Sequence, residues 1–241
     1  MLDHIAANLR QIFPLERHRV RQRLRRLARP AWLGTLRRTT PLSDHWGFDR
    51  GTPLDRYYIE RFLEEHCQDI RGRVLEVRDS RYSDRYGIGV QRRDILDIDP
   101  KNPNATIVVD LANADTIPPD QFDCFVLTQT LQFIYDTRAA VAHAHRILRP
   151  GGVLLATVPA VSRLDRWSID YWRFTAASCL ALFGAIFGIE QVTVRSYGNV
   201  LTATAFLTGM ACEELSSREL GVNDEYFPLI ITVRAVKQCN S

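Results

Sequence analysis

Four short apolar runs between Gly72 and Leu127 limit the folds that this chain can adopt. They read GRVLEV, DILDIDP, TIVVDL and FDCFVL, and polar or turn residues separate them. Such runs are typical of buried parallel strands. Asp97 lies 20 residues after Val77, the end of the first run. In nucleotide-binding α/β units an acid about 20 residues after the first strand accepts hydrogen bonds from ribose hydroxyls, so the pattern predicts a site for an adenosine-containing small molecule.

The length and composition are those of an ordinary globular protein. The 241 residues are 46% hydrophobic and 24% charged, which fits one α/β domain with an appended arm, or at most two small domains. The five cysteines are scattered and form no CxxC pair, which favours reduced thiols in the cytoplasm. The sequence shows no secretory signal and no apolar run of the roughly 18–20 residues that span a bilayer.

Positive charge is concentrated in the first 50 residues, which contain 11 arginines against 4 acids. Apolar residues recur at helical spacing through residues 1–29, so we expect a basic amphipathic helix in two pieces, interrupted near Pro14. The favoured interpretation is a solvated helix that covers the domain. Peripheral contact with a membrane or a protein is the alternative, and no motif indicates nucleic acid.

Two regions are expected. Residues 1–53 form the basic helical arm and an aromatic-rich connector, and residues 54–241 form an α/β domain. The strands are expected at 73–77, 95–98, 106–109, 122–127, 152–158, 190–197 and 229–236. The helices are expected at about 54–69, 137–148, 176–187 and 200–220, with an irregular loop at 78–90 and a tight turn at Pro150-Gly151-Gly152. This order predicts a Rossmann-like, doubly wound, seven-stranded and mostly parallel sheet with an N-terminal helical arm.

Residues 54–236 resemble the class I S-adenosylmethionine-dependent methyltransferases, of the type 11-like group. The stretch RILRPGGVLLATVP (146–159) is similar to the helix, Pro-Gly-Gly turn and fifth strand of that family. VLEV, LDIDP and VDLANADTIP resemble its first strand, its second strand and the segment beside adenine. FDCFVLTQTLQFIYD resembles the fourth strand and the loop at the methyl-transfer centre, and DYWRFT resembles a segment of members that act on sugars or small natural products.

The resemblance implies S-adenosylmethionine as the cofactor and assigns it a set of residues. Asp97 would bind the ribose, with Asp99 as an alternative, and Glu76 would order the first loop or form a structural salt bridge. The cofactor-binding candidates are Glu76, Asp79, Asp97, Asp110, Leu111 and Thr130.

The chain departs from the family in its first loop. Arg78, Ser80 and Tyr82 occupy places where the family usually has glycines. Glycine lets a backbone approach a ligand closely and adopt positive φ. Side chains at these places could fill the methionine end of the pocket, or an arginine or serine could hold the carboxylate of the cofactor.

The acceptor side is expected in the DYWRFT stretch. Tyr171, Trp172 and Arg173 are candidate substrate contacts, with core packing as the alternative, and Asp170 and Gln129 are the catalytic candidates. No metal motif and no arrangement for covalent catalysis is present.

The resemblance implies an enzyme that O-methylates a sugar, a polyketide or another small acceptor, and the scattered cysteines favour the cytoplasm. It would act without nucleic acid, and a homodimer is one oligomeric state that the sequence leaves open. The alternatives are a non-catalytic, methyltransferase-like scaffold in a biosynthetic assembly, or a non-methylating enzyme that uses the same pocket.

Overall fold

The structure, a computed structural model, describes residues 20–28 and 34–239. The chain divides into two compact units, Met1–Thr40 and Pro41–Ser241. In the first unit, residues 20–28 form a helix and the short 3-10 helix η1 (Gly34–Leu36) follows. The helical piece expected before Pro14 lies outside the described residues.

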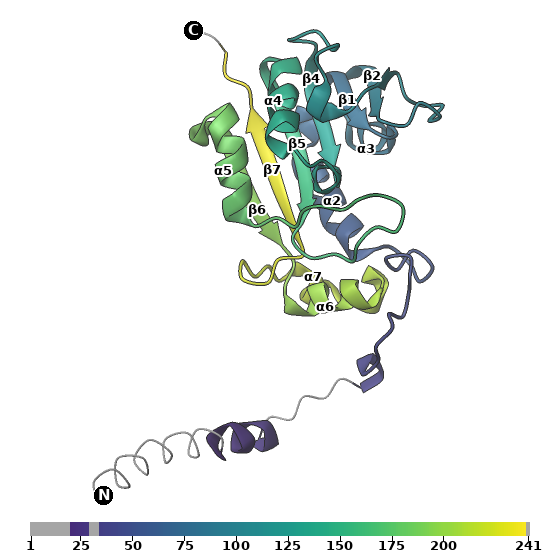
Figure 1. The fold of residues 1–241 in the computed structure, drawn as a ribbon, viewed down its shortest axis with the longest axis vertical. Helices are drawn as coiled ribbons and strands as arrows, with labels where there is room; N and C mark the ends of the chain where they lie inside the picture. Colours follow the sequence, from purple (N-terminus) through teal and green to yellow (C-terminus); the bar gives the residue numbers. More distant parts are fainter. Residues whose placement is uncertain (1–19, 29–33, 240–241) are drawn as a thin grey trace, which may run out of the picture. The chain divides into compact units, whose positions relative to one another are not determined.

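A seven-stranded sheet forms the centre of the second unit (Figure 1). Its order is β3-β2-β1-β4-β5-β7-β6, and β7 is antiparallel to both of its neighbours while the other pairs are parallel. The order reverses between β1 and β4, which is where open α/β sheets bind ligands. The strands are β1 (Gly72–Val77), β2 (Val90–Asp97), β3 (Ile107–Val108), β4 (Phe122–Thr128), β5 (Leu148–Pro159), β6 (Val192–Tyr197) and β7 (Ile230–Val236). The prediction of a doubly wound, mostly parallel sheet is confirmed.

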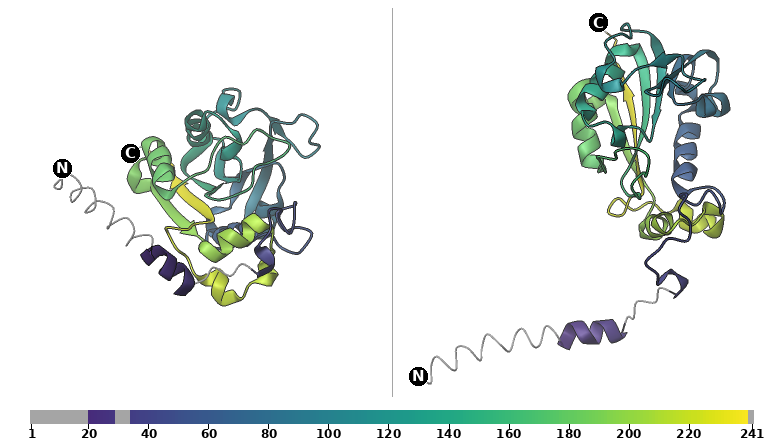
Figure 2. Two further views of the ribbon diagram at one scale, coloured as in Figure 1. Left: turned by 60° about the horizontal axis from the view of Figure 1, so that its bottom comes forward. Right: turned by 45° about the vertical axis from the view of Figure 1, so that its right-hand side comes forward.

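Helices cover both faces of the sheet (Figure 2). One core cluster contains side chains of α4 and α5, and the other contains side chains of α2, α3 and α6. The α-helices are α2 (Leu54–Glu65), α3 (Arg81–Tyr86), α4 (Thr137–Ile147), α5 (Ala176–Phe187), α6 (Val200–Thr208) and α7 (Ser217–Gly221). The further 3-10 helices are η2 (Cys67–Asp69), η3 (Leu111–Asn113), η4 (Leu131–Phe133), η5 (Ile189–Gln191) and η6 (Cys212–Glu214).

The irregular loop expected at 78–90 contains the helix α3, so that prediction was wrong. Asp79 accepts from the backbone N–H of Arg81, the first residue of α3, at 3.0 Å, and Glu76 accepts from the next two backbone N–H groups. Polar side chains that satisfy the first amides of a helix allow even a short helix to start. The hydrophobic pattern of this segment is too short to reveal it.

The helix expected at 200–220 is also interrupted. It ends at Thr208, because Gly209 adopts the left-handed conformation (φ 77°) that closes helices. A Cβ atom on Gly209 would lie 2.4 Å from the carbonyl oxygen of Ser43, so only glycine permits this close approach. The expected turn at 150–152 is in fact a bulge within β5, where the register to β4 shifts.

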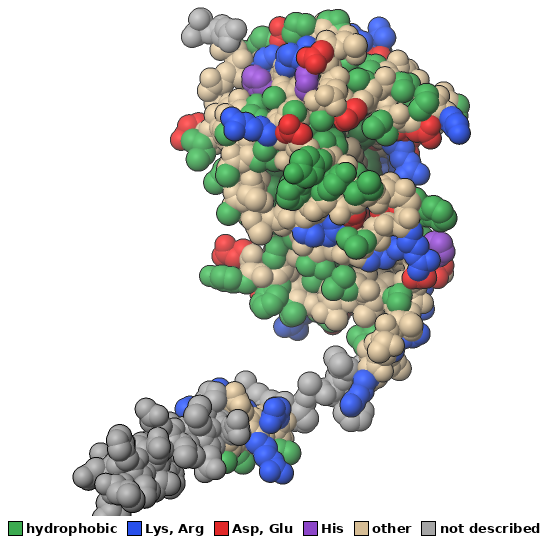
Figure 3. Space-filling model, in the orientation of Figure 1, with side chains coloured by type: hydrophobic (Ala, Val, Ile, Leu, Met, Phe, Trp, Pro, Cys, Tyr) green, Lys and Arg blue, Asp and Glu red, His purple; other side chains and the backbone are tan. Residues whose placement is uncertain are grey.

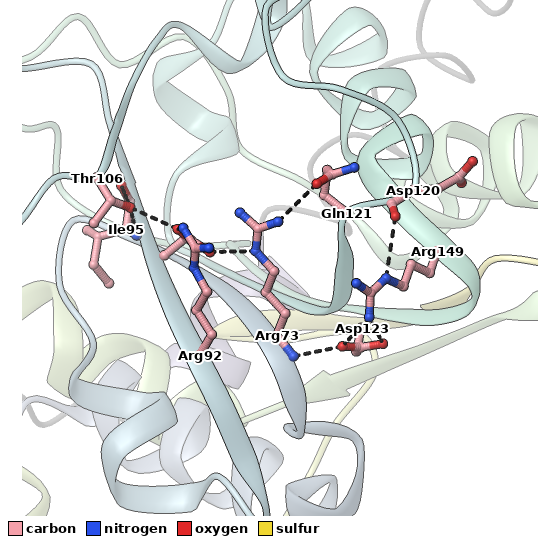
Figure 4. Close-up of polar contacts among 9 residues, drawn as sticks. Arg73, Arg92, Ile95, Thr106, Asp120, Gln121, Asp123 and Arg149 are labelled. Atoms are coloured by element: carbon pink, nitrogen blue, oxygen red, sulfur yellow. Dashed lines mark hydrogen bonds and ion pairs between the residues drawn. The ribbon is translucent and has the colours of Figure 1, made fainter.

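A polar network joins β2, β1 and β4 (Figure 4). The buried Asp94 accepts from the guanidinium groups of Arg73 at 2.7 Å and Arg92 at 3.0 Å. Asp123 accepts from the backbone N–H of Arg73 at 2.7 Å and from Arg149 at 3.0 Å. Burial alone would raise the pKa of Asp94, but the two guanidinium groups outweigh it and hold the pKa below its ordinary value of 3.8.

We predict that Asp94→Asn lowers the free energy of unfolding by about 2 kcal/mol near neutral pH, because it removes two charge-assisted hydrogen bonds. The pKa of Asp94 is lowered on folding. Its stabilisation is therefore present above the unfolded pKa and is lost as the pH falls through the folded value. Denaturant unfolding at several pH values would show the difference from the wild type shrinking below pH 3.8.

The exposed Asp115→Asn is the matched control and should change little. An equal loss of stability at all pH values would contradict the ion-pair account.

Candidate active site

The functional candidates gather where the parallel strands end. Because β1, β2, β4 and β5 run in the same direction, their carboxyl ends meet at one edge of the sheet, here called the carboxyl edge. It is formed by the residues at and directly after Val77, Asp97, Thr128 and Pro159.

Glu76 fixes the first loop. Its carboxylate, 1% exposed, accepts from the backbone N–H groups of Tyr82 at 2.9 Å and Ser83 at 2.8 Å. Burial raises the pKa of Glu76, while these hydrogen bonds oppose the shift. Of the two roles expected for Glu76, its contacts are those of a residue that orders the loop through backbone amides.

The first loop keeps a backbone shape that glycine favours. Arg78 adopts the left-handed conformation with φ 72°, at the place of the first family glycine. Its side chain is exposed. Tyr82 is buried against α2, where its hydroxyl accepts from Arg56 Nη1 at 2.7 Å, and Ser80 bonds Asp84. Of the three side chains at the places of the family glycines, Ser80 and Tyr82 therefore bond to residues of α3 and α2.

Asp97 ends β2 and is connected to the first loop through Asn102. The Asn102 amide donates to the Asp97 carboxylate at 2.6 Å and to the carbonyl of Arg78 at 2.7 Å. Asp97 also accepts from the backbone N–H of Asp99 at 3.0 Å. The half-buried Asp97 thus lies beside the first loop, whereas Asp99 is exposed.

Asp110 and Leu111 follow β3. Asp110 accepts from the backbone N–H of Ala112 at 2.9 Å and from the Asn113 amide at 3.1 Å, and thereby caps η3. Leu111 is buried in the core. Asp79 caps α3 through the Arg81 amide and is half-buried.

The end of β4 carries a strained glutamine. Gln129 has φ 46°, and its Nε2 is buried without a hydrogen-bond partner among the described residues. The buried Gln132 donates through Nε2 to the carbonyl of Gln129 at 3.0 Å. The Thr130 hydroxyl donates to the Thr128 carbonyl at 2.9 Å. Non-glycine residues at positive φ cluster at functional sites, and here Arg78 and Gln129 both lie at the carboxyl edge.

The DYWRFT stretch is attached to the same strand end. The backbone N–H groups of Tyr171 and Trp172 donate to the carbonyl of Gln132 at 2.8 Å and 3.3 Å. Arg173 forms a bidentate ion pair with Asp170, with N–O distances of 2.5 Å and 2.8 Å, and the Asp170 side chain is only 5% exposed. The Asp170 carboxylate is therefore bound to Arg173 in this structure.

Aromatic side chains cluster beside this loop. Tyr135 packs edge to face on Tyr171 at 5.4 Å and tilted on Trp172 at 6.0 Å, and all three are exposed. The Trp172 indole N–H donates to the carbonyls of Ile134 and Tyr135. In Figure 3, hydrophobic side chains gather across the middle of the domain. Tyr171 and Trp172 are thus held by specific contacts and expose aromatic surface.

The connector before α2 contacts the loop after β5. The Arg163 guanidinium lies 3.5 Å above the centre of the Trp46 ring, and Arg166 forms an ion pair with Asp44 at 2.6 Å. Leu42 donates to the Thr208 carbonyl at 2.7 Å. Residues 41–53 and 160–173 are therefore joined beside the carboxyl edge.

Sequence reasoning missed four polar residues at this edge. Asn102 and Gln132 hold loops in place, as described above. Asp55, at the start of α2, lines a narrow cavity together with Gln129, Pro159 and Ser162, and its neighbour Arg56 bonds Tyr82. The Pro-Leu-Asp-Arg stretch marks a helix start, but it does not reveal that this start faces the strand ends.

A larger cavity than the one beside Gln129 lies elsewhere, at the amino ends of the strands. Gly72, Asp123 and Arg149 line it, and Arg149 and Asp123 are paired with each other. The described part of the chain contains no group of three or more His, Cys, Asp or Glu placed to hold a metal ion. No helix in that same part is long and apolar enough to cross a membrane.

The carboxyl edge fits S-adenosylmethionine. Asp97 offers a half-buried carboxylate suited to ribose hydroxyls, and Arg78 adopts a positive φ that glycine favours. Arg56 Nε and Gln129 Nε2 are buried donors without a hydrogen-bond partner among the residues described. Buried polar atoms are almost always satisfied, so such donors are candidates for a ligand.

The left-handed conformation of Arg78 gives a test. A β-branched residue is strained at φ 72° and glycine is not, so we expect Arg78→Val to lower the free energy of unfolding by about 1–2 kcal/mol and Arg78→Gly to lower it by less than that. Denaturant unfolding of the two variants measures the difference. Equal stability of the Val and Gly variants would contradict the loop geometry.

Comparison with known proteins agrees with this fold. Residues 72–156 match the family described as "Methyltransferase domain". A comparison with curated proteins gave no match.

Solved structures share the fold at low sequence identity. The [4+2]-cyclase SpnF is 16% identical, with a TM-score of 0.52 over 83% of this chain and 87% of that one. A SAM-dependent methyltransferase from Archaeoglobus fulgidus is 12% identical, with a TM-score of 0.51 over 76% of this chain and 94% of its own. An S-adenosylmethionine-dependent methyltransferase from Mesorhizobium loti is 15% identical, with a TM-score of 0.51 over 76% of this chain and 100% of its own. Residues 72–156 therefore match a methyltransferase domain, and the chain shares the fold of S-adenosylmethionine-dependent methyltransferases. This match implies S-adenosylmethionine as the cofactor.

Proposed function

We propose that the protein transfers a methyl group from S-adenosylmethionine to an oxygen of a small acceptor, such as a sugar or natural product. One observation carries the proposal. The loop that bears Tyr171 and Trp172 is hydrogen-bonded to Gln132, and Gln132 is bonded to Gln129 at the end of β4. The candidate acceptor loop is thus attached to the strand end at which a methyltransferase of this fold carries out its reaction.

The cofactor residues divide by position. Asp97 binds the ribose hydroxyls, and Asp110 and Leu111 flank the adenine. Glu76 acts indirectly, since each of its carboxylate oxygens accepts a hydrogen bond from a backbone N–H of α3. Asp79, in the first loop, would bind the amino group of the cofactor, and Thr130, after β4, would lie near the reacting centre. When bound, the cofactor supplies an activated methyl group, and the protein mainly has to align the acceptor with it.

On the acceptor side, the exposed rings of Tyr171 and Trp172 offer stacking faces to a sugar or an aromatic acceptor. Gln129 has a buried amide N–H group with which to orient an acceptor oxygen. The Asp170–Arg173 ion pair holds the loop. A role of Asp170 as general base stays a prediction, and it requires this pair to open.

A second candidate is a non-methylating enzyme that uses the same pocket. The similar structure described as a [4+2]-cyclase supports it, because that protein has this fold. Formation of S-adenosylhomocysteine separates the two candidates, since only methyl transfer produces it. A non-catalytic scaffold would form no product of either kind. A cytoplasmic location, a homodimer and a membrane or protein partner for the basic arm remain parts of the proposal.

Asp97 provides the test of the cofactor site. We expect calorimetry to give S-adenosylmethionine and S-adenosylhomocysteine dissociation constants on the order of micromolar. Asp97→Ala should weaken both by about 10-fold or more, because charge-assisted hydrogen bonds to the ribose are lost.

Asp99→Ala is the matched control, since Asp99 is exposed and two residues away. Its effect should be less than about 2-fold, within the ±0.5 kcal/mol typical of surface substitutions. Unchanged affinity in Asp97→Ala, or a larger loss in Asp99→Ala, would overturn the assignment of Asp97.

A further inference from the structure

The first loop has side chains where the family usually has glycines, so an element beside the loop can contribute contacts to the amino-acid end of the cofactor. The start of α2 is placed to do so. Pro53 forms a β-bridge with Ala211 and is directly followed by the helix, whose first turn contains Asp55 and Arg56. Both side chains are half-buried beside the carboxyl edge.

Arg56 reaches the first-loop side of this edge. Its Nη1 donates to the hydroxyl of Tyr82 at 2.7 Å, and Tyr82 stands at the place of the third family glycine. Its Nε is buried and has no hydrogen-bond partner among the described residues. Leaving such a donor unsatisfied costs about 1–3 kcal/mol. The arginine is thus both positioned by a loop residue and able to donate further hydrogen bonds.

Asp55 reaches the β4 side of the same edge. It lines a narrow cavity with Gln129, whose Nε2 is likewise buried and unpartnered in the described part of the chain. The Asp55 carboxylate accepts from the backbone N–H of Arg56 at 2.8 Å. The Arg56 guanidinium group therefore lies beside the first loop, and the Asp55 carboxylate lies beside the end of β4.

Asp55 and Arg56 attract each other, and each stabilises the charged form of the other. Burial raises the pKa of Asp55 above its ordinary value, against the attraction of Arg56. Burial alone would lower the pKa of Arg56, but Asp55, the Tyr82 hydroxyl and Asp79 outweigh it and raise the pKa. The Arg56 guanidinium group, with Asp55 and Asp79 near it, forms a site of both charges. Such a site is complementary to a ligand that carries a carboxylate, which pairs with the guanidinium group, and an ammonium group, which pairs with a carboxylate.

From this geometry we infer that Asp55 and Arg56 bind the amino-acid end of the cofactor. Arg56 holds its α-carboxylate through the guanidinium group, and Asp55 holds its α-ammonium group. The inference rests on the proposed function and adds a site on α2 that takes over from the missing glycines. Tyr82, which replaces one of those glycines, is then the residue that orients Arg56.

Two ligands isolate this contact. S-adenosylhomocysteine has the amino-acid end, whereas 5′-methylthioadenosine has the same adenosine and thioether without it. We expect Arg56→Gln to weaken S-adenosylhomocysteine binding by about 10- to 100-fold, the loss for a charge-assisted hydrogen bond, and to change 5′-methylthioadenosine binding by less than about 2-fold. Asp55→Asn should show the same selectivity with a loss of about 10-fold.

Two controls separate binding from folding. Arg61→Gln removes a partly exposed arginine from the same helix and should leave both affinities unchanged. Tyr82→Phe removes the bond that orients Arg56 but keeps the charge, so it should weaken S-adenosylhomocysteine binding less than Arg56→Gln does. Thermal melts of each variant verify that it is folded.

The outcomes are distinguishable. If the wild type binds neither ligand, the proposed function fails and the inference fails with it. If the wild type binds both and the Arg56 and Asp55 variants lose both equally or lose neither, the proposed function stands and the assignment to α2 is overturned. Selective loss of S-adenosylhomocysteine supports the inference.

Discussion

The carboxyl edge depends on the buried carboxylate of Glu76. Its two hydrogen bonds to the first turn of α3 fix the direction in which the chain leaves β1. They place Tyr82 against α2, where its hydroxyl meets Arg56, and they leave Arg78 in the left-handed conformation. A carboxylate that satisfies the first amides of a helix thus does here what a glycine-rich sequence usually does, which is to set the shape of the loop.

Strain and unsatisfied donors coincide at this edge. The positive φ values of Arg78 and Gln129 lie at the ends of β1 and β4, next to each other in the sheet. Buried amide and guanidinium donors lie at the same place. Both features lower the free energy of unfolding, and neither is needed to hold the fold together. Trp46 and Asp120 also have positive φ, and Arg146 Nε is also a buried donor without a partner among the described residues. The coincidence of both features at the topological switch point, where open α/β sheets bind ligands, is the physical argument for a ligand site there.

The sequence predicts the sheet well, because its strands are continuous apolar runs with clear ends, as in β4 and β5. Asp97 at the end of β2 follows from its spacing alone. The sequence does not reveal α3, since its start depends on the carboxylates of Asp79 and Glu76, which accept from its first backbone N–H groups, and not on hydrophobic periodicity. It also does not reveal the end of α6 at Gly209, which depends on contact with Ser43. Asp55 and Arg56 escape notice because their role depends on a contact with Tyr82, 26 residues away from Arg56.

The central claim is that the carboxyl edge binds S-adenosylmethionine in spite of its glycine-free first loop. A crystal structure of the protein grown with S-adenosylhomocysteine tests it most directly. The account predicts the ribose at Asp97, the homocysteine end between the first loop and α2, and Arg78 still at positive φ. A first loop that fills this space, with the ligand elsewhere or unbound, would contradict the claim.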